Sequence, residues 1–385
     1  MRSLPLLVTL GTFGLTTAKQ LLVASYGNGT SAGAIQTLEL LSGSDEGSNP
    51  KLKVVHENHD CRLSPTWLDV SLDGDSVTCL DESAPIANIT TLSIEPNGSL
   101  KKISAISVLG GPVSMTTYNN RSAMALAHYG PLPAISLFTI KADNSFGSLP
   151  NLTFQAPEQI HQAVTDPTGQ YMVFPSLGAD LVHVFCIDPA SGLLAKHVPL
   201  QCKKGYGPRH AVFWSSGELQ KIYLFVVHEN SNKIVGYEVG YLEHGGLTFS
   251  EVVEVSTYGD HPAPPMTFAS ELAISPDGKF LIAANRNGSV FEIDHPDPRN
   301  STNLSSDSLV TFRLLPNGNL LFVQLAKSGG IYPRHFSMNK DGSLIAVANQ
   351  KTKNVNVYSR NLETGAITDD KAIASAEKLG PGDLM

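Results

Sequence analysis

The segment PRHAVFWSSGELQKIYLFVVHEN, residues 208–230, shows the pattern that recurs along this chain and decides its fold. Pro208 precedes a short apolar stretch, residues 216–217 mark a turn, and a second apolar stretch ends at His228-Glu229-Asn230. Two short apolar runs joined by a tight polar turn are typical of a β-hairpin. The segment therefore predicts two antiparallel strands with charged and polar side chains grouped at one end.

The same unit recurs at residues 64–82, 111–129, 160–176, 270–286 and 333–350. A third alternating strand is expected after each unit, for example over residues 181–187, 234–239, 290–293 and 354–358, and a fourth usually follows another turn. Four strands per repeat at a period of about 40–60 residues is the pattern of a β-propeller blade.

The six units, together with N-terminal strands expected over 21–26 and 34–40, make seven blades. The predicted fold class is therefore all-β, a seven-bladed β-propeller with four antiparallel strands per blade. We expect the N-terminal strand to close the ring by joining the blade that begins at Pro333. A pair of β-sandwiches or a β-helix is the alternative, and the grouping of strands in fours argues against both.

The composition agrees with a turn-rich β protein. Only 16% of the 385 residues are charged, and the chain has 33 Gly and 24 Pro, which excludes a coiled coil. The net charge of −8 argues against a general nucleic-acid binder. The length allows two domains or one large β domain, and the repeats predict a single domain over residues 19–385.

Residues 1–18 have the three parts of a secretory signal peptide: a basic start at Arg2, an apolar run over 4–15, and small residues before a cleavage site after Ala18. A buried N-terminal strand or helix is the alternative. No other segment approaches the ~20 unbroken apolar residues of a membrane helix. We therefore expect a secreted, soluble protein, outside the cell or in the cell wall, without a membrane span.

Cysteines and glycosylation motifs fit the same route. Four cysteines allow three disulfide connectivities; proximity favours Cys61–Cys79 and Cys186–Cys202, and four free thiols are the alternative. No Cys or His spacing typical of zinc, calcium loop, P-loop or dinucleotide motif is present, so neither a metal nor a cofactor is expected. Eight glycosylation motifs predict a glycoprotein, at Asn28, Asn88, Asn97, Asn120, Asn151, Asn287, Asn300 and Asn303.

The blade topology predicts a functional site. The first strand of a blade lines the channel and the second runs antiparallel outside it, so residues before the first and after the second strand share one end of the hairpin. Seven blades would bring these positions to one mouth of the channel. The positions are Glu82, His161, Arg209, His210, Glu229, Glu271, Arg286, Arg334, His335 and Gln350. Three arginines among imidazoles and carboxylates suit a small carboxylate or other anion.

Structural roles are the alternative for several of these residues. Arg334 could bridge neighbouring blades, His210 and His335 could bond to backbone along the channel, and Glu271 could cap a turn or pair with an arginine. The GxSxG motif around Ser31 predicts no nucleophile, because residues 34–40 read as a strand where that motif needs a helix. The His56–His59 pair has the wrong spacing for a metal-binding HExxH helix.

Several motifs resemble those of the seven-bladed lactonase family, namely 166–169 (DPTG), 177–180 (LGAD), 207–213 (GPRHAVF), 275–278 (SPDG) and 284–286 (ANR). This family contains the propeller-type 6-phosphogluconolactonases and the fungal carboxy-cis,cis-muconate lactonizing enzyme, and the resemblance extends from about Leu21 to Ile367. It implies a metal-free catalytic set at His161, Arg209, Glu229 and Arg286.

The chain also departs from the family pattern. Ser176 and His228 stand where the family has Asp and Asn, a Ser/Asn-rich loop is inserted over 294–308, and the signal peptide does not suit a phosphorylated sugar lactone, which is a cytosolic metabolite. These departures fit a secreted, fungal-like member of the family and leave its substrate open.

We therefore expect a metal-independent lactonase-family enzyme that acts on a small anionic lactone or its open-chain acid. The reaction is either 6-phosphogluconolactonase-like hydrolysis or carboxymuconate cyclase-type lactonization, with His161 or Glu229 as the base. The expected substrate-binding residues are His210, Glu271, Arg334, His335 and Gln350. A catalytically silent secreted glycoprotein with a binding or adhesion surface is the alternative. The expected partner is the small anion alone, with a monomeric protein.

Overall fold

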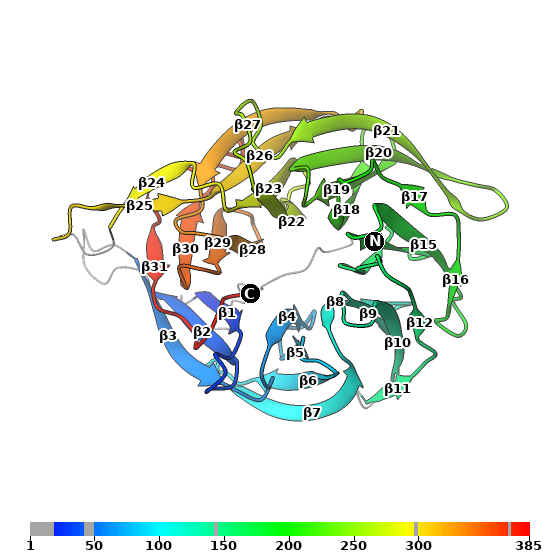
Figure 1. Ribbon diagram of the computed structural model, residues 1–385, viewed down its shortest axis with the longest axis horizontal. Helices are drawn as coiled ribbons and strands as arrows, with labels where there is room; N and C mark the ends of the chain where they lie inside the picture. The colour runs from blue at the N-terminus through cyan, green and yellow to red at the C-terminus, as the bar shows by residue number, and fades with distance from the viewer. Residues whose placement is uncertain (1–18, 42–49, 142–144, 296–298, 369–370) are drawn as a thin grey trace.

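Seven antiparallel sheets surround a central axis (Figure 1) in the computed structural model, which describes residues 19–41, 50–141, 145–295, 299–368 and 371–385. The predicted signal peptide lies outside the described residues. We number the sheets blade 1 to blade 7 in chain order. The seven-bladed propeller predicted from the repeats is confirmed. Within the described residues, no helix has the length and apolar character needed to cross a membrane.

Blade 1 contains β1 (Lys19–Ser25), β2 (Ala34–Leu41) and β3 (Lys51–Asn58). Blade 2 contains β4 (Pro65–Val70), β5 (Ser76–Asp81), β6 (Ile86–Ile94) and β7 (Leu100–Leu109). Blade 3 contains β8 (Pro112–Tyr118), β9 (Ala123–His128), β10 (Ala134–Ile140), β11 (Phe146–Ser148) and β12 (Leu152–Thr153). Blade 4 contains β13 (Val164–Thr165), β14 (Tyr171–Ser176), β15 (Leu181–Ile187), β16 (Leu194–Lys196) and β17 (Leu200–Gln201). Blade 5 contains β18 (Pro208–Ser216), β19 (Lys221–His228), β20 (Lys233–Tyr241) and β21 (Leu247–Ser256). Blade 6 contains β22 (Phe268–Ile274), β23 (Phe280–Arg286), β26 (Ser308–Leu314) and β27 (Leu320–Lys327). Blade 7 contains β28 (Pro333–Met338), β29 (Leu344–Asn349), β30 (Asn354–Ser359) and β31 (Ala374–Ala376).

The number of strands per blade varies around the predicted four. Blades 2, 5, 6 and 7 have four each, whereas in blades 3 and 4 the outer strand is divided into two short pieces that pair with the same neighbour. Second strands such as β9, β14, β23 and β29 are buried along their whole length, because both faces pack against neighbouring blades. Seven apolar clusters lie between adjacent blades and join the ring into one body.

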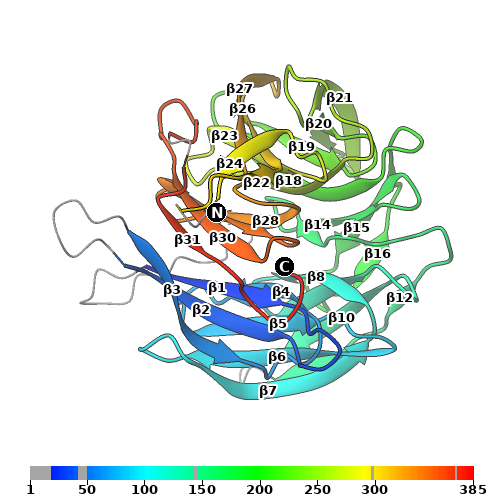
Figure 2. The same ribbon diagram turned by 60° about the vertical axis from the view of Figure 1, so that its left-hand side comes forward.

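The ring closes differently from our prediction. The N-terminal strand β1 does not join the blade that begins at Pro333, but forms blade 1 with β2 and β3. The C-terminal segment crosses from β31 to the centre of the ring (Figures 1 and 2), where Leu384 forms an antiparallel bridge with Ser25 and Met385 N donates to Ala24 O at 2.9 Å. This pairing covers the inner edge of β1, whose buried backbone groups would otherwise lack partners.

The insertion in blade 6 also differs from our prediction. Residues 290–293 were expected to form the third strand of that blade, but residues 291–293 belong to β24 (Phe291–Asp294). Among the described strands, β24 pairs only with β25 (Asn303–Ser306), in a separate hairpin. The third strand is β26, which pairs with β23. Alternating apolar residues signalled a strand here but could not distinguish a blade strand from an inserted hairpin.

One of the two predicted disulfides is confirmed. Cys61 is bonded to Cys79, whereas Cys186 and Cys202 are free, so the second predicted pair is wrong. Cys202 N donates to Asp180 O at one end of β15, and Cys186 lies near the other end. Six residues of extended strand span about 20 Å, far beyond the ~7 Å between Cα atoms that a disulfide allows.

Candidate active site

A repeated β-bulge positions the predicted site residues at one end of the innermost strands. The pairing register shifts at the start of the innermost strand in blades 2, 3, 5, 6 and 7. Two residues then oppose one on the second strand, which re-aims neighbouring side chains. The bulges place Arg209-His210 on β18 and Arg334-His335 on β28 beside a common pocket.

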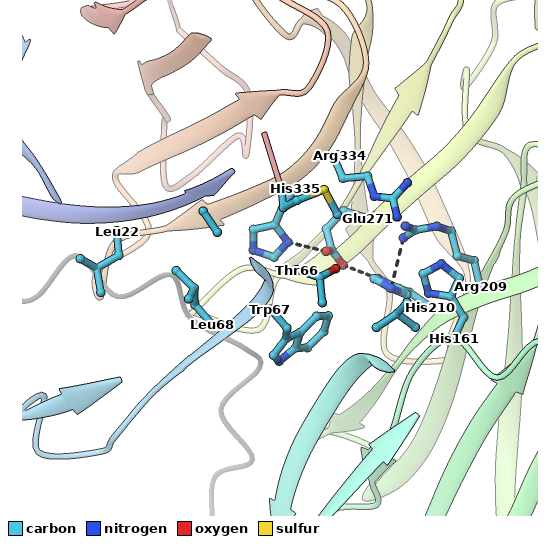
Figure 3. A pocket seen from close by; sticks show the side chains of 13 residues that line it. Leu22, Thr66, Trp67, Leu68, His161, Arg209, His210, Glu271, Arg334 and His335 are labelled. Atoms are coloured by element: carbon cyan, nitrogen blue, oxygen red, sulfur yellow. Dashed lines mark hydrogen bonds and ion pairs between the residues drawn. The ribbon is translucent and has the colours of Figure 1, made fainter. Parts of the chain in front are cut away.

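The innermost strand or segment of every blade contributes side chains to this pocket, together with the C-terminal Met385 (Figure 3). Its lining residues are Leu22, Ala24, Thr66, Trp67, Leu68, Val113, His161, Arg209, His210, Glu271, Arg334, His335 and Met385. Of the predicted site residues, the lining includes His161, Arg209, His210, Glu271, Arg334 and His335.

Glu229, which follows β19, holds two buried guanidinium groups beside the pocket. Its Oε2 lies 2.9 Å from Arg209 Nε and 2.8 Å from Arg286 Nη2. Each arginine also donates to a backbone carbonyl of β22, Arg209 to Ser270 O at 2.7 Å and Arg286 to Ala269 O at 2.8 Å. Both guanidinium groups are therefore fixed in position, since each contacts a carboxylate and a carbonyl.

The pocket and the side chains beside it carry an excess of positive charge. Burial and the nearby charges of Arg334 and Arg286 lower the pKa of Arg209 to about 9, which still leaves it protonated at neutral pH. Burial would raise the pKa of Glu229, but Arg286 and Arg209 outweigh burial and lower it, so this carboxylate is ionised. Arg334 forms no hydrogen bond or ion pair with any described residue. Its guanidinium group is therefore available to an anion.

His161 is a buried, neutral imidazole. Only 5% of its surface is exposed, and its ring centroid lies 5.7 Å from that of Tyr129 and 5.1 Å from that of His210. Burial, followed by the nearby charges of Arg209 and Arg334, lowers the pKa of His161 well below its ordinary value. Its Nδ1 has no hydrogen-bond partner within the part of the chain that the structure describes. An imidazole in this state can accept a proton at neutral pH.

Glu271 lies between two histidines from neighbouring blades. His210 Nδ1 lies 2.8 Å from Glu271 Oε1, and His335 Nδ1 lies 2.6 Å from Glu271 Oε2. Burial lowers the pKa of His210 to about 4, so the ring is neutral and donates its Nδ1 proton to the carboxylate. Its Nε2 then faces Arg209 Nη1 at 3.1 Å as an acceptor. Glu271 and His210 thus orient Arg209, and these histidines bond to side chains rather than to backbone.

Four predicted residues lie outside the pocket lining: Glu229 and Arg286, which pair with each other beside it, and Gln350 and Glu82, which do not adjoin that pair. Gln350 Nε2 donates to Asp383 Oδ2 at 3.1 Å, which ties blade 7 to the C-terminal segment. Glu82 accepts a hydrogen bond from the Tyr26 hydroxyl. The sequence rule that selected these positions is correct about the end of the blade but does not say which way each side chain turns.

Two aspartates that hold the arginine-bearing segments were not predicted. Asp307, fully buried, accepts from Asn287 N at 2.8 Å and Tyr332 N at 2.7 Å through Oδ2. It therefore links the residue after Arg286 to the segment that enters β28. Asp180, in the LGAD motif, accepts from Gly205 N at 2.6 Å and Gly207 N at 2.8 Å, just before β18. The shared signal is an aspartate directly before the third strand of a blade.

The apolar side of the pocket was also not predicted, although Trp67 and Val113 occupy the same bulge positions as the arginines and histidines. Tyr332 was missed as well; its ring lies 5.0 Å from the Arg286 guanidinium. Ser31 has no catalytic partner in His59, because His59 Nδ1 contacts Gly33 O at 2.8 Å and Nε2 contacts Glu57 at 3.0 Å. No cluster of three or more potential metal ligands occurs among the described residues.

Comparison with known proteins agrees with the fold. Residues 20–379 match the family described as lactonase, 7-bladed beta-propeller. A probable 6-phosphogluconolactonase of Arthroderma benhamiae is 28% identical over 363 residues, which cover 91% of this chain and 86% of the relative. A 6-phosphogluconolactonase of Formosa agariphila is 25% identical over 327 residues, which cover 80% of this chain and 84% of the relative.

The solved structure of the Pseudomonas aeruginosa periplasmic gluconolactonase PpgL has a TM-score of 0.76 at 24% identity, covering 96% of this chain and 99% of that one. At that identity, the likeness shows the fold. The family match spans the chain from its first described strand to the C-terminal segment. The protein therefore belongs to the seven-bladed β-propeller lactonase family.

Proposed function

We propose that this protein hydrolyses a small anionic lactone at the pocket in the channel mouth. One observation carries the proposal: a buried neutral imidazole, His161, lines the same pocket as the fixed Arg209 and the unpaired Arg334. Opening a charged lactone requires three groups: a base that activates water, a cation that stabilises the oxyanion, and a cation that binds the substrate's own negative charge. The relatives named as 6-phosphogluconolactonases support hydrolysis rather than ring formation.

His161 acts as the general base in this proposal. It takes a proton from water as the water oxygen bonds to the lactone carbonyl carbon, and the carbonyl becomes an oxyanion. Arg209, held by Glu229, Ser270 O and His210, stabilises that oxyanion. The bond between the carbonyl carbon and the ring oxygen then breaks, and the leaving alkoxide takes the proton back from His161. The product is the open hydroxy acid.

Glu229 is assigned a positioning role rather than that of the base. Its Oε2 already contacts both Arg209 and Arg286, so this oxygen is engaged before a water could approach it. A carboxylate engaged by two guanidinium groups is better suited to fixing them than to activating water.

The test is acid release from glucono-δ-lactone, 6-phosphoglucono-δ-lactone and carboxylated γ-lactones, followed by pH-stat with and without a chelator. We expect turnover that the chelator does not change and that falls at least ~100-fold in Arg209→Gln, the size of losing one oxyanion donor. Lys221→Gln, which removes an exposed ion pair with Glu238, is the matched control and should keep full activity. Chelator-sensitive activity, or full activity in Arg209→Gln, would overturn the mechanism.

Export and glycosylation are part of the proposal. Seven of the eight motif asparagines are exposed and Asn88 is half-buried, and the Cys61–Cys79 disulfide is of a kind that forms in oxidising compartments. Expression in a eukaryotic host should place the protein in the medium, and N-glycosidase should reduce its mass. Retention inside the cell without a mass change would contradict this part.

A further inference from the structure

We propose that the substrate is amphipathic: an anionic lactone with an apolar alkyl or aryl substituent, rather than a polyhydroxylated sugar lactone. This inference rests on the proposed function and concerns what the same pocket selects. Its basis is the unequal chemistry of the two sides of the pocket, which we name the charged wall and the apolar wall.

The charged wall comes from blades 4 to 7. It consists of His161, Arg209, His210, Glu271, Arg334 and His335. Most of its charge is already compensated, since Arg209 contacts Glu229 and Glu271 contacts both His210 and His335. Arg334 is the exception and has no described partner. This wall therefore offers one free guanidinium group, which suits a single carboxylate or similar anion.

The apolar wall comes from blades 1 to 3. Leu22 and Ala24 on β1, Trp67 and Leu68 on β4 and Val113 on β8 line the pocket, each with no more than 8% of its surface exposed. Figure 3 shows Leu22, Leu68 and Trp67 on one side of the pocket, with Arg334, Arg209 and His161 on the other. The only hydroxyl in the lining of this side belongs to Thr66, which interacts with the Tyr26 hydroxyl.

A sugar lactone fits this arrangement poorly. Its ring carries hydroxyl groups on most carbons, and a hydroxyl placed against Leu22, Leu68 or Val113 loses its hydrogen bonds to water without gaining new ones. An alkyl or aryl group in the same place gains by leaving water. A lactone with its anion at Arg334 and an apolar substituent opposite would match both walls together.

Paired substrates test this selectivity on the wild-type protein. We would compare a carboxylated γ-lactone with its butyl- or phenyl-substituted analogue and with 6-phosphoglucono-δ-lactone. We expect kcat/KM for the substituted compounds to exceed that for the phosphosugar lactone at least tenfold. Higher kcat/KM for the phosphosugar lactone, or equal values for substituted and parent γ-lactones, would overturn the inference.

Variants locate the selectivity on the apolar wall. Val113→Thr keeps the side-chain shape but adds a hydroxyl, and should lower the ratio of kcat/KM for substituted over parent lactone about fivefold. Leu72→Ser, at a leucine that is 74% exposed and remote from the pocket lining, is the matched control and should leave the ratio unchanged. An unchanged ratio in a folded Val113→Thr protein would place the selectivity elsewhere.

Binding separates this inference from the proposed function. In His161→Asn, calorimetry would compare butyl- or phenyl-substituted hydroxy acids with 6-phosphogluconate, without turnover. Tighter binding of the substituted acids, together with no hydrolysis of any lactone by wild-type protein, would support the amphipathic site and refute the lactonase proposal. Hydrolysis without any preference for apolar substituents would support the lactonase proposal and refute the amphipathic site.

Discussion

The charged and apolar walls are built on the same scaffold but present different chemistry. Both use the innermost strand of a blade, and in blades 2, 3, 5, 6 and 7 both use a bulge at its start. The first bulge position is Arg209 in blade 5 and Arg334 in blade 7, but Thr66 in blade 2 and Val113 in blade 3. The backbone therefore determines where these side chains lie, and the residue chosen at each bulge determines what they do.

The walls also differ in how much support they need. The charged wall depends on side chains outside the pocket, because each buried charge requires a partner: Glu229 lies between two arginines, and Asp307 and Asp180 hold the entering segments. The apolar wall depends on packing alone. Substitutions of these partner residues outside the pocket should therefore impair the charged wall. The same substitutions should leave the apolar wall unchanged.

Replacing His161, the general base in the charged wall, should lower activity more than any other substitution considered. His161→Asn should lower kcat by about 10²- to 10⁴-fold, the usual contribution of a general base, with little change in melting temperature. His244→Asn, at an exposed histidine, is the matched control and should keep full activity. Retention of more than a tenth of the wild-type kcat in His161→Asn would exclude this imidazole as the base.

His228, behind the charged wall, should make the protein sensitive to acid. Burial lowers its pKa to about 4, below the unfolded value near 6.5, so the unfolded state binds the proton first. The stability it contributes is complete above pH 6.5 and is lost as the pH falls toward 4, by about 3 kcal/mol. His228→Asn should reduce that loss in urea unfolding, since Asn285 and Asn349 occupy matching positions. Identical acid sensitivity in both proteins would contradict this account.

Arg334 should bind the substrate anion and influence His161. Arg334→Gln should raise KM about tenfold, the size of a charge-assisted hydrogen bond. Because the charge of Arg334 helps to lower the pKa of His161, its removal should also move the acid limb of the kcat/KM profile to higher pH. Lys351→Gln, at an exposed lysine, serves as the control. A raised KM with an unmoved acid limb would separate the two roles and contradict the second.

Asp307 should affect the charged wall without touching the pocket. Asp307→Asn replaces one acceptor oxygen by a donor that faces backbone N–H groups, so the segments carrying Arg286 and Arg334 should shift. We expect kcat/KM to fall about fivefold, the size of one lost hydrogen bond, with a smaller fall in Asp180→Asn. Asp294→Asn, at an exposed ion pair, is the control. Selectivity for apolar substituents should survive, and its loss would contradict the independence of the two walls.

Much of this architecture could be predicted from the sequence because it repeats. Period, turns and apolar runs predicted the blades, and hairpin topology predicted that residues 161, 209, 229 and 286 would meet. Bulge geometry could not be predicted, because the extra residue lies at the start of the strand, before the apolar run that reveals the strand. Closure by Leu384 could not be predicted either, because it depends on which strand edge is left unpaired. The Cys186–Cys202 prediction failed because the two residues, although close in sequence, lie near opposite ends of β15.

The pH dependence of kcat/KM for the preferred lactone, measured from pH 4 to 8 on wild-type protein, tests the central claim that a buried neutral His161 is the base. Because the pKa of His161 lies well below its ordinary value of 6.5, the profile should stay flat through pH 6.5 and decline only at lower pH. The protein should remain folded over the range in which the decline is read. A profile that has already lost half its activity at pH 6.5 or above would contradict the account.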